Sequence, residues 1–233
     1  MAVKKQEKKP GWRKVLKIFV WLFILQLVYI IIGIFFNPPI TITQSVNIIK
    51  GYGFKRDYIS YNKMGTNIKL AVMAGEDQLF PDHNGFDMKS IEKAMAYNKK
   101  HPNKIRGAST ISQQTAKNVF LWQGGGFFRK GLEVYFTFMI EKIWGKRRIL
   151  ERYLNVAEMG PGIFGVQAAA KKYFNKNASE LTRQEAAMIA ACLPNPKRFT
   201  VKPLSRYVQI RSSIILRYMN NIQGDVDIIK LLR

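Results

Sequence analysis

The chain has 233 residues, of which 47% are hydrophobic, and its 38 Lys and Arg residues against 15 Asp and Glu give a formal net charge of +23. This length and apolar content suffice for one sizeable core and a membrane segment. So large a positive charge implies an anionic partner: nucleic acid, an anionic membrane surface or a phosphate-bearing substrate. The single cysteine, Cys192, excludes an intrachain disulfide and is expected to be a small core residue.

The N-terminal end of the chain has the pattern of a membrane anchor. Residues 1–17 form a basic tail with seven positive charges and one negative charge. Residues 18–36 are uncharged, with Gln26 as the only strongly polar side chain, and as a helix they would rise about 28 Å, close to the thickness of a bilayer core. A cleaved signal peptide would need a small-residue cleavage site, which residues 37–40 do not offer. We therefore expect one uncleaved anchor with its N-terminus in the cytoplasm, which argues against nucleic acid as the partner.

A linker or juxtamembrane segment over residues 37–60 begins with Pro38 and Pro39, which end the anchor helix. The segment has no clear period, and an extended stretch over residues 41–43 is one interpretation. Residues 61–233 then read as a single, mostly α domain. Helices are predicted up to Glu76 and over residues 87–97, 109–120, 129–144, 146–156, 166–174, 182–193 and 204–220.

The helices have recognisable ends and faces. Asp87 is expected to cap the second, with Ile91, Ala94 and Met95 at buried spacing, and Thr182 to open a capping box.

The stretch over residues 71–87 organises the domain. Leu70, Met73 and Ala74 share one helical face, and Glu76 and Asp77 stand where that helix ends. A carboxylate at the end of a rigid apolar element is how a site raises the pKa of a general base or acid. Taken alone, two solvated acids at a helix end would be the more common explanation.

Two further stretches carry polar groups at helical spacing. Around Ser109 and Thr110, small residues let the backbone approach a ligand, and Gln113, Gln114 and Lys117 share one face that suits a sugar bearing an anionic group. A polar surface helix is the alternative for this stretch.

Arg129 and Glu133 lie four residues apart on the next helix, either as an ordinary salt bridge or, with Lys130, as part of a phosphate site.

Together these stretches resemble the peptidoglycan glycosyltransferases. Residues 76–87 are similar to the first signature of that family, residues 107–118 to the second, Arg129-Lys130 with Glu133 to the third, and residues 146–155 to the fourth. Residues 155–170 and 193–196 resemble the monofunctional branch of Gram-negative bacteria. In Ser90-Ile91-Glu92-Lys93 we see a coincidental Ser-x-x-Lys, because no Lys-Thr-Gly follows.

The resemblance implies a fold, a reaction and a location. It implies a lysozyme-like helical domain that polymerises lipid II into glycan strands, with inversion and release of undecaprenyl diphosphate. Lipid II, the growing strand and anionic membrane lipids would be the partners, together with cell-wall synthases or division proteins. The protein would be a single-pass inner-membrane protein with a periplasmic catalytic domain. No cofactor is required by this reading, although Mg²⁺ or another divalent cation would suit a diphosphate.

Residue roles follow from the same resemblance. Glu76 matches the catalytic base and Glu133 the second catalytic glutamate, whose role is either metal binding or proton handling. Asp77, Phe80 and His83 would support the site, His83 as a structural hydrogen-bonding residue. The substrate and its diphosphate would be bound by Ser109, Thr110, Gln113, Gln114, Lys117, Asn118, Arg129 and Lys130.

Two other functions account for part of the sequence. A membrane-anchored lysozyme-like hydrolase or lytic enzyme also has one key glutamate, but Lys117, Arg129 and Lys130 would be idle in it. A non-enzymatic basic scaffold on anionic lipid explains the charge but not the ordered motifs. The loop over residues 122–128 ends in Phe127 and Phe128, which either enter the membrane or begin the core of the next helix.

Overall fold

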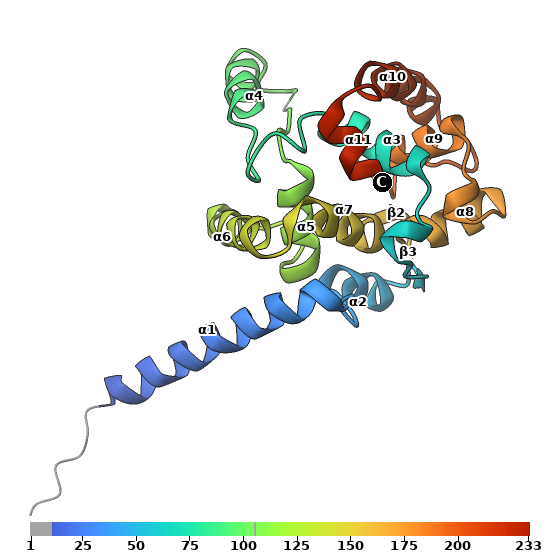
Figure 1. The fold of residues 1–233 in the computed structure, drawn as a ribbon. Helices are drawn as coiled ribbons and strands as arrows, with labels where there is room; N and C mark the ends of the chain where they lie inside the picture. The colour runs from blue at the N-terminus through green and yellow to red at the C-terminus, as the bar shows by residue number, and fades with distance from the viewer. Residues whose placement is uncertain (1–10, 105) are drawn as a thin grey trace, which may run out of the picture. The chain divides into compact units, whose positions relative to one another are not determined.

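The computed structural model describes residues 11–104 and 106–233, and these residues contain eleven α-helices, two 3₁₀ helices and three short strands (Figure 1). The prediction of a mostly α protein is confirmed. The chain forms two units, an N-terminal one that ends at Phe36 and a compact one over Asn37–Arg233.

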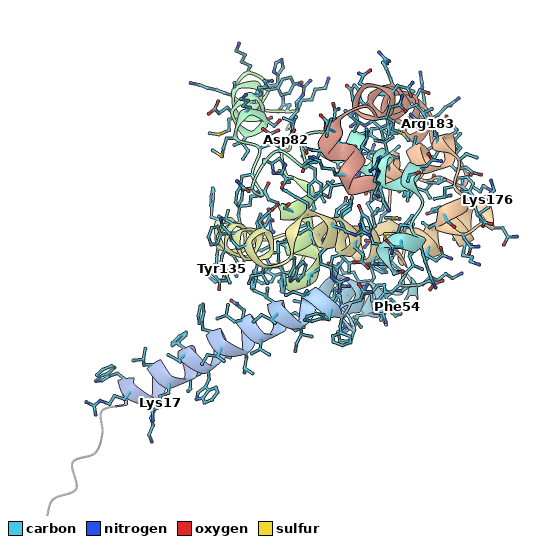
Figure 2. The ribbon with its side chains drawn as sticks, in the orientation of Figure 1. Lys17, Phe54, Asp82, Tyr135, Lys176 and Arg183 are labelled. Carbon is cyan, nitrogen blue, oxygen red and sulfur yellow. The ribbon has the colours of Figure 1, made fainter. Side chains whose placement is uncertain are left out.

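Helix α1 (Trp12–Phe35) forms the N-terminal unit and is long and apolar enough to cross a membrane. It starts earlier than the expected span of residues 18–36, so Arg13, Lys14 and Lys17 lie on its first turns. Most of its large apolar side chains are exposed and project from the helix along its whole length (Figure 2). Such a surface matches a single-pass membrane anchor, because lipid rather than protein would cover it.

The segment after the anchor is folded. Thr41 and Gln44 form a capping box, in which each side chain accepts the backbone N–H of the other, and this starts α2 (Ile42–Ile49). The interpretation of residues 41–43 as extended is therefore wrong. β1 (Lys55–Arg56) pairs in parallel with β3 (Ile163–Phe164), which also pairs antiparallel with β2 (Glu158–Gly160). Because β1 pairs with a strand more than 100 residues downstream, no local sequence pattern predicts the sheet.

Helix α3 (Thr66–Glu76) lies at the centre of the compact unit. It follows the 3₁₀ helix η1 (Tyr61–Lys63), and every residue from Ile68 to Ala74 is buried. It packs against α9 (Arg183–Cys192), α10 (Arg206–Ile222) and α11 (Val226–Leu232), as Figure 1 shows. Cys192 is fully buried, as expected of a small core residue.

A second group of helices forms the other wall of the domain. α5 (Ile111–Phe120) packs against both α6 (Phe127–Ile143) and α7 (Gly145–Val156). α8 (Val166–Phe174) and the 3₁₀ helix η2 (Ala178–Glu180) join this group to α9, where the predicted capping box of Thr182 with Glu185 is confirmed.

Helix α4 (Met88–Lys100) stands apart from the other helices in Figure 1. Asp87 caps it as predicted and accepts a hydrogen bond of 2.9 Å from the backbone N–H of Ser90. The predicted burial of Ile91, Ala94 and Met95 is wrong, because no residue of α4 is buried and Met95 is 67% exposed. A helical period identifies an apolar face but does not show whether another element covers it.

Candidate active site

Glu76 is the last residue of the buried helix α3. A Cβ on the preceding residue, Gly75, would lie 3.1 Å from Cδ1 of Ile215 and 3.8 Å from Cβ of Ala190. A side chain at this position would crowd Ile215 of α10, while Ala190 of α9 would lie at ordinary contact distance. The glycine thus allows three helices to meet at the point where Glu76 emerges.

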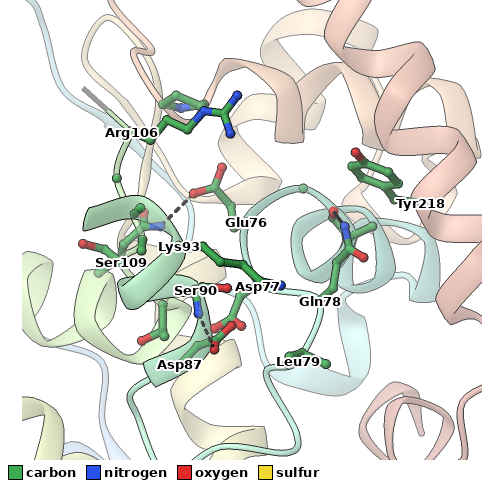
Figure 3. A pocket seen from close by; sticks show the side chains of 18 of the residues that line it. Glu76, Asp77, Gln78, Leu79, Asp87, Ser90, Lys93, Arg106, Ser109 and Tyr218 are labelled. Carbon is green, nitrogen blue, oxygen red and sulfur yellow. Dashed lines mark hydrogen bonds between the residues drawn. The ribbon is translucent and has the colours of Figure 1, made fainter. Parts of the chain in front are cut away.

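Glu76 opens into a cleft of about 640 Å³. The wall of this Glu76 cleft is built by the end of α3, one side of α4, residues 106–110, the start of α5 and α10 (Figure 3). Ser109, Thr110 and Gln114 line it, as do three cationic residues without a predicted role, Lys93, Arg106 and Arg211. The lining combines these cations with the carboxylates of Glu76, Asp77 and Asp87, so the cleft suits a polar ligand.

A chain of hydrogen bonds holds the Glu76 carboxylate. The Tyr153 hydroxyl donates to Oε1 of Gln114 at 3.1 Å, and Nε2 of Gln114 donates to Oε2 of Glu76 at 2.7 Å. Because an ionised carboxylate only accepts hydrogen bonds, the amide nitrogen of Gln114 faces Glu76 and its oxygen faces the Tyr153 hydroxyl. Burial raises the pKa of Glu76 above its ordinary value, while the bond from Gln114 and the charges of Arg211 and Lys117 act in the opposite direction.

Asp77 joins the end of α3 to the start of α5. One carboxylate oxygen accepts the backbone N–H of Ile111 at 2.9 Å, and Nε2 of His83 donates to the other at 3.0 Å. Nδ1 of His83 accepts the N–H of Gly85 at 3.1 Å, which leaves Nε2 as the ring nitrogen that binds Asp77. His83 thus serves as a hydrogen-bonding residue that orients Asp77.

The turn over residues 77–87 is fixed by further contacts. Phe80 is fully buried, and the ammonium of Lys146 lies 4.6 Å from its ring centroid. The Thr110 hydroxyl donates to the carbonyl of Gly85 at 2.7 Å. Gly85 has φ +90°, and a Cβ there would lie 2.8 Å from Cγ2 of Thr137, so only glycine fits. The turn therefore sets the spacing between Glu76 and α5.

Residues 109–118 divide between structural and cleft-facing positions. Thr110 and Gln113 form a capping box, which uses the Gln113 side chain at the helix start, whereas Gln114 faces the cleft. Asn118 accepts a hydrogen bond of 3.0 Å from Gln123 of the following loop. The structure thus brings Gln114 to Glu76 and leaves Gln113 and Asn118 with local partners.

A cation cluster, which we define as Lys117, Arg129 and Lys130, lies farther along α5 and at the start of α6. Nη1 of Arg129 binds Oε2 of Glu133 at 2.6 Å, and Nζ of Lys130 binds Oε1 of the same carboxylate. Glu133 is 3% exposed, so it holds both cations from below the surface. Nε of Arg129 is buried without a hydrogen-bond partner in the described residues. The three cations of the cluster and the single Glu133 carboxylate together carry a net charge of +2. A cluster with spare donors and spare charge suits an anion.

Lys117 connects this cluster to Glu76. It lies three residues after Gln114 on α5, so the two side chains share a face of the helix. Burial lowers the pKa of Lys117, Arg129 and Lys130 lower it further, and Glu133 and Glu76 raise it. The ammonium is therefore within electrostatic reach of both carboxylates. Lys117 thus links the cation cluster electrostatically to Glu76, although the residue itself does not line the Glu76 cleft.

Several residues of this site were not singled out by sequence reasoning. Tyr153 belongs to the fourth signature, which could have drawn attention to it. Arg106, Arg211 and Tyr218 line the Glu76 cleft but lie outside the matched signatures.

The residues near Glu133 do not fit a divalent metal ion. Magnesium prefers several oxygen ligands, but both Glu133 oxygens already bind cationic side chains. Within residues 11–104 and 106–233, no group of three or more His, Cys, Asp or Glu side chains is placed to hold a metal.

Comparison with known proteins identifies the family. A family model described as transglycosylase matches residues 43–220. The chain is 57% identical over 169 residues to the biosynthetic peptidoglycan transglycosylases of Shigella boydii serotype 4 and of Escherichia coli ATCC 8739, covering 72% of this chain and 70% of each relative. The matched region includes Glu76, the cation cluster and the helices that position them. The chain belongs to the transglycosylase family.

Proposed function

We propose that this peptidoglycan glycosyltransferase polymerises lipid II, with Glu76 as the base and the cation cluster as the binding site of the departing diphosphate. The observation that carries the proposal is that one helix, α5, binds Glu76 through Gln114 and carries Lys117, which interacts electrostatically with both Glu76 and Glu133. A hydrolase would need the carboxylate but would have no anionic leaving group for the three cations to bind.

The chemistry requires one proton acceptor and one anion site. Glu76 removes the proton from the 4-hydroxyl of one sugar as that oxygen attacks the anomeric carbon of another. The bond from the anomeric carbon to the diphosphate oxygen breaks on the opposite face, so the configuration inverts. Lys117, Arg129 and Lys130 neutralise the charge that grows on the diphosphate. Ser109, Thr110 and Gln114 line the sugar side of the cleft.

We assign Glu133 a positioning role for the cation cluster. Because both of its oxygens bind cations, it is already occupied as an acceptor and is poorly placed to receive a substrate proton. Replacing it with Gln should lower the rate by loosening Arg129 and Lys130, without moving the acid limb of the pH–rate profile. A shift of that limb would instead assign Glu133 to proton transfer.

We further propose that the start of α6 enters the membrane that holds the substrate. Phe127 is 99% exposed and Phe128 77% exposed, which removes the alternative that they begin a core. Because Cys192 is buried and is the only cysteine, a spin label will react selectively at Phe127→Cys. In vesicles this label should be reached by oxygen rather than by a water-soluble nickel complex. A label at Val226→Cys, which is 65% exposed on α11, is the control, and equal nickel access at both sites would contradict the proposal.

The location follows from the anchor and the substrate. We propose an inner-membrane protein whose catalytic domain faces the periplasm, because basic residues crowd the N-terminal end of α1. A membrane-impermeant thiol reagent should label Val226→Cys in intact spheroplasts. Labelling that appears only after lysis would reverse the orientation.

One experiment separates synthesis from its alternatives. The purified full-length protein is incubated with labelled lipid II, and the product is treated with lysozyme. Polymer that lysozyme digests is expected. A hydrolase would instead shorten a preformed glycan strand, and a scaffold would leave both substrates unchanged.

A further inference from the structure

Helix α10 meets α3 at the residue before Glu76. Ile215 of α10 lies against Gly75, where a Cβ would be only 3.1 Å from its Cδ1. This close approach brings Arg211, one helical turn before Ile215, to the end of α3. An arginine 135 positions downstream of Glu76 thus reaches the same cleft wall as the carboxylate.

Arg211 binds the backbone at this helix end. Its Nη2 donates a hydrogen bond of 3.0 Å to the carbonyl of Gly75. That carbonyl is among the last four of α3, which have no partner within the helix, and a cation is favourable at a helix C-terminus. Arg211 therefore holds the peptide unit that carries Glu76. The guanidinium keeps further N–H donors, and the residue lines the Glu76 cleft.

The charged and titratable groups around Glu76 come from several elements, and Lys93 of α4 and Arg106 line the same cleft (Figure 3). Arg211 and Lys117 favour the ionised carboxylate through their charge, and Gln114 favours it through its hydrogen bond. Burial and the Asp77 carboxylate act against it. Tyr153 of α7 and Cys192 of α9 also interact electrostatically with Glu76. Lys117 also interacts with Glu133 and its two cations, whereas Arg211 forms no ion pair with a second carboxylate within residues 11–104 and 106–233.

We propose that Arg211 is a positioning residue that fixes the end of α3 and keeps Glu76 ionised for proton abstraction. The proposal rests on the assignment of Glu76 as the base. An arginine suits this task because its charge persists at all relevant pH values and its planar donors can bind a carbonyl while facing a carboxylate. A structural residue that only joined α10 to α3 would affect stability but not the ionisation of Glu76.

The test is the pH dependence of polymerisation by the full-length protein with lipid II. The profiles of the wild type, Arg211→Gln, Arg211→Lys and Arg217→Gln are compared from about pH 5 to pH 9, a range chosen to include the acid limb set by the base. Arg217 is the matched control, because it is exposed on the same helix and lies outside the cleft wall. A pH dependence that comes from the substrate itself should appear equally in the profiles of Arg217→Gln and the wild type.

We expect Arg211→Gln to move the acid limb to higher pH by about one unit, since a neighbouring opposite charge shifts a carboxyl pKa by one to three units. Arg211→Lys should keep the limb near its wild-type position, and Arg217→Gln should match the wild type. If Arg211→Gln does not fold, Arg211→Met keeps an unbranched stem of similar packing and removes the charge.

A uniform loss of rate with an unmoved acid limb in the charge-removing variant would overturn the proposal. A limb that moves equally in Arg211→Lys would also overturn it, because charge would then not be the cause. Failure of the wild type to make lysozyme-sensitive polymer, or full activity in Glu76→Gln, would refute the proposed function separately.

Discussion

Replacing Glu76 with Gln isolates the role of the carboxylate. The side chains have nearly the same shape, and the new amide oxygen can still accept the 2.7 Å hydrogen bond from Gln114. The substitution therefore removes proton abstraction while keeping the local structure. A positioned general base contributes about 10²- to 10⁴-fold, or roughly 3–5 kcal/mol of the barrier. We expect kcat for polymerisation to fall by at least about 10²-fold, with lipid II binding nearly unchanged.

The same substitution should not destabilise the fold. Burial raises the pKa of Glu76 in the folded state above its ordinary value of 4.5, so the native state holds this proton more tightly than the unfolded chain does. Wild-type stability therefore falls as the pH rises from about 4.5 through the raised pKa. Glu76→Gln lacks this loss, so its Tm relative to the wild type should increase from acid to neutral pH.

Initial rates with labelled lipid II and thermal unfolding in the same detergent test both parts. The matched control is Glu92→Gln, which replaces an exposed carboxylate of α4 outside the cleft wall and should leave kcat and Tm unchanged. A Glu76→Gln rate within about tenfold of the wild type would refute the assignment of the base. A large fall in its Tm at neutral pH would show that the carboxylate is structural.

Three further substitutions test other parts of the site and the core. Lys117→Ala should lower kcat by about 10²-fold or more through lost stabilisation of the diphosphate, and Lys117→Arg should recover part of it; a rise in KM alone in steady-state assays would contradict this role. Gly85→Ala should destabilise the fold by about 2 kcal/mol, because φ is +90° and the new Cβ would meet Thr137; an unchanged Tm would disprove the strain. Burial lowers the pKa of Lys69 in the folded state to about 8, so between about pH 8 and 10.5 the folded protein has lost a proton that the unfolded chain still holds. Wild-type stability should therefore rise in that window, and the Tm of Lys69→Met relative to the wild type should fall. A constant difference in Tm would show that Lys69 stays charged.

Local signals were sufficient wherever a structure is made by neighbours in the chain. The caps of α4, α5 and α9 follow from Asp87, Thr110 and Thr182, each of which binds a backbone N–H three residues ahead. α2 was missed although Thr41 and Gln44 carry the same capping signature, because adjacent prolines and short length obscured it. The first signature likewise located Glu76 and Asp77 at the end of a helix.

The sequence by itself therefore determined the helical class, the apolar anchor, the order of the signatures and the residue types available for catalysis. Only the tertiary structure decided which side chains meet. It left α4 uncovered, joined β1 to β3, used Gln113 in the capping box of α5 and placed Arg211 at the end of α3. The physical reason is that helical and capping patterns arise from residues three or four positions apart, whereas a cleft arises from packing between elements that no local period connects.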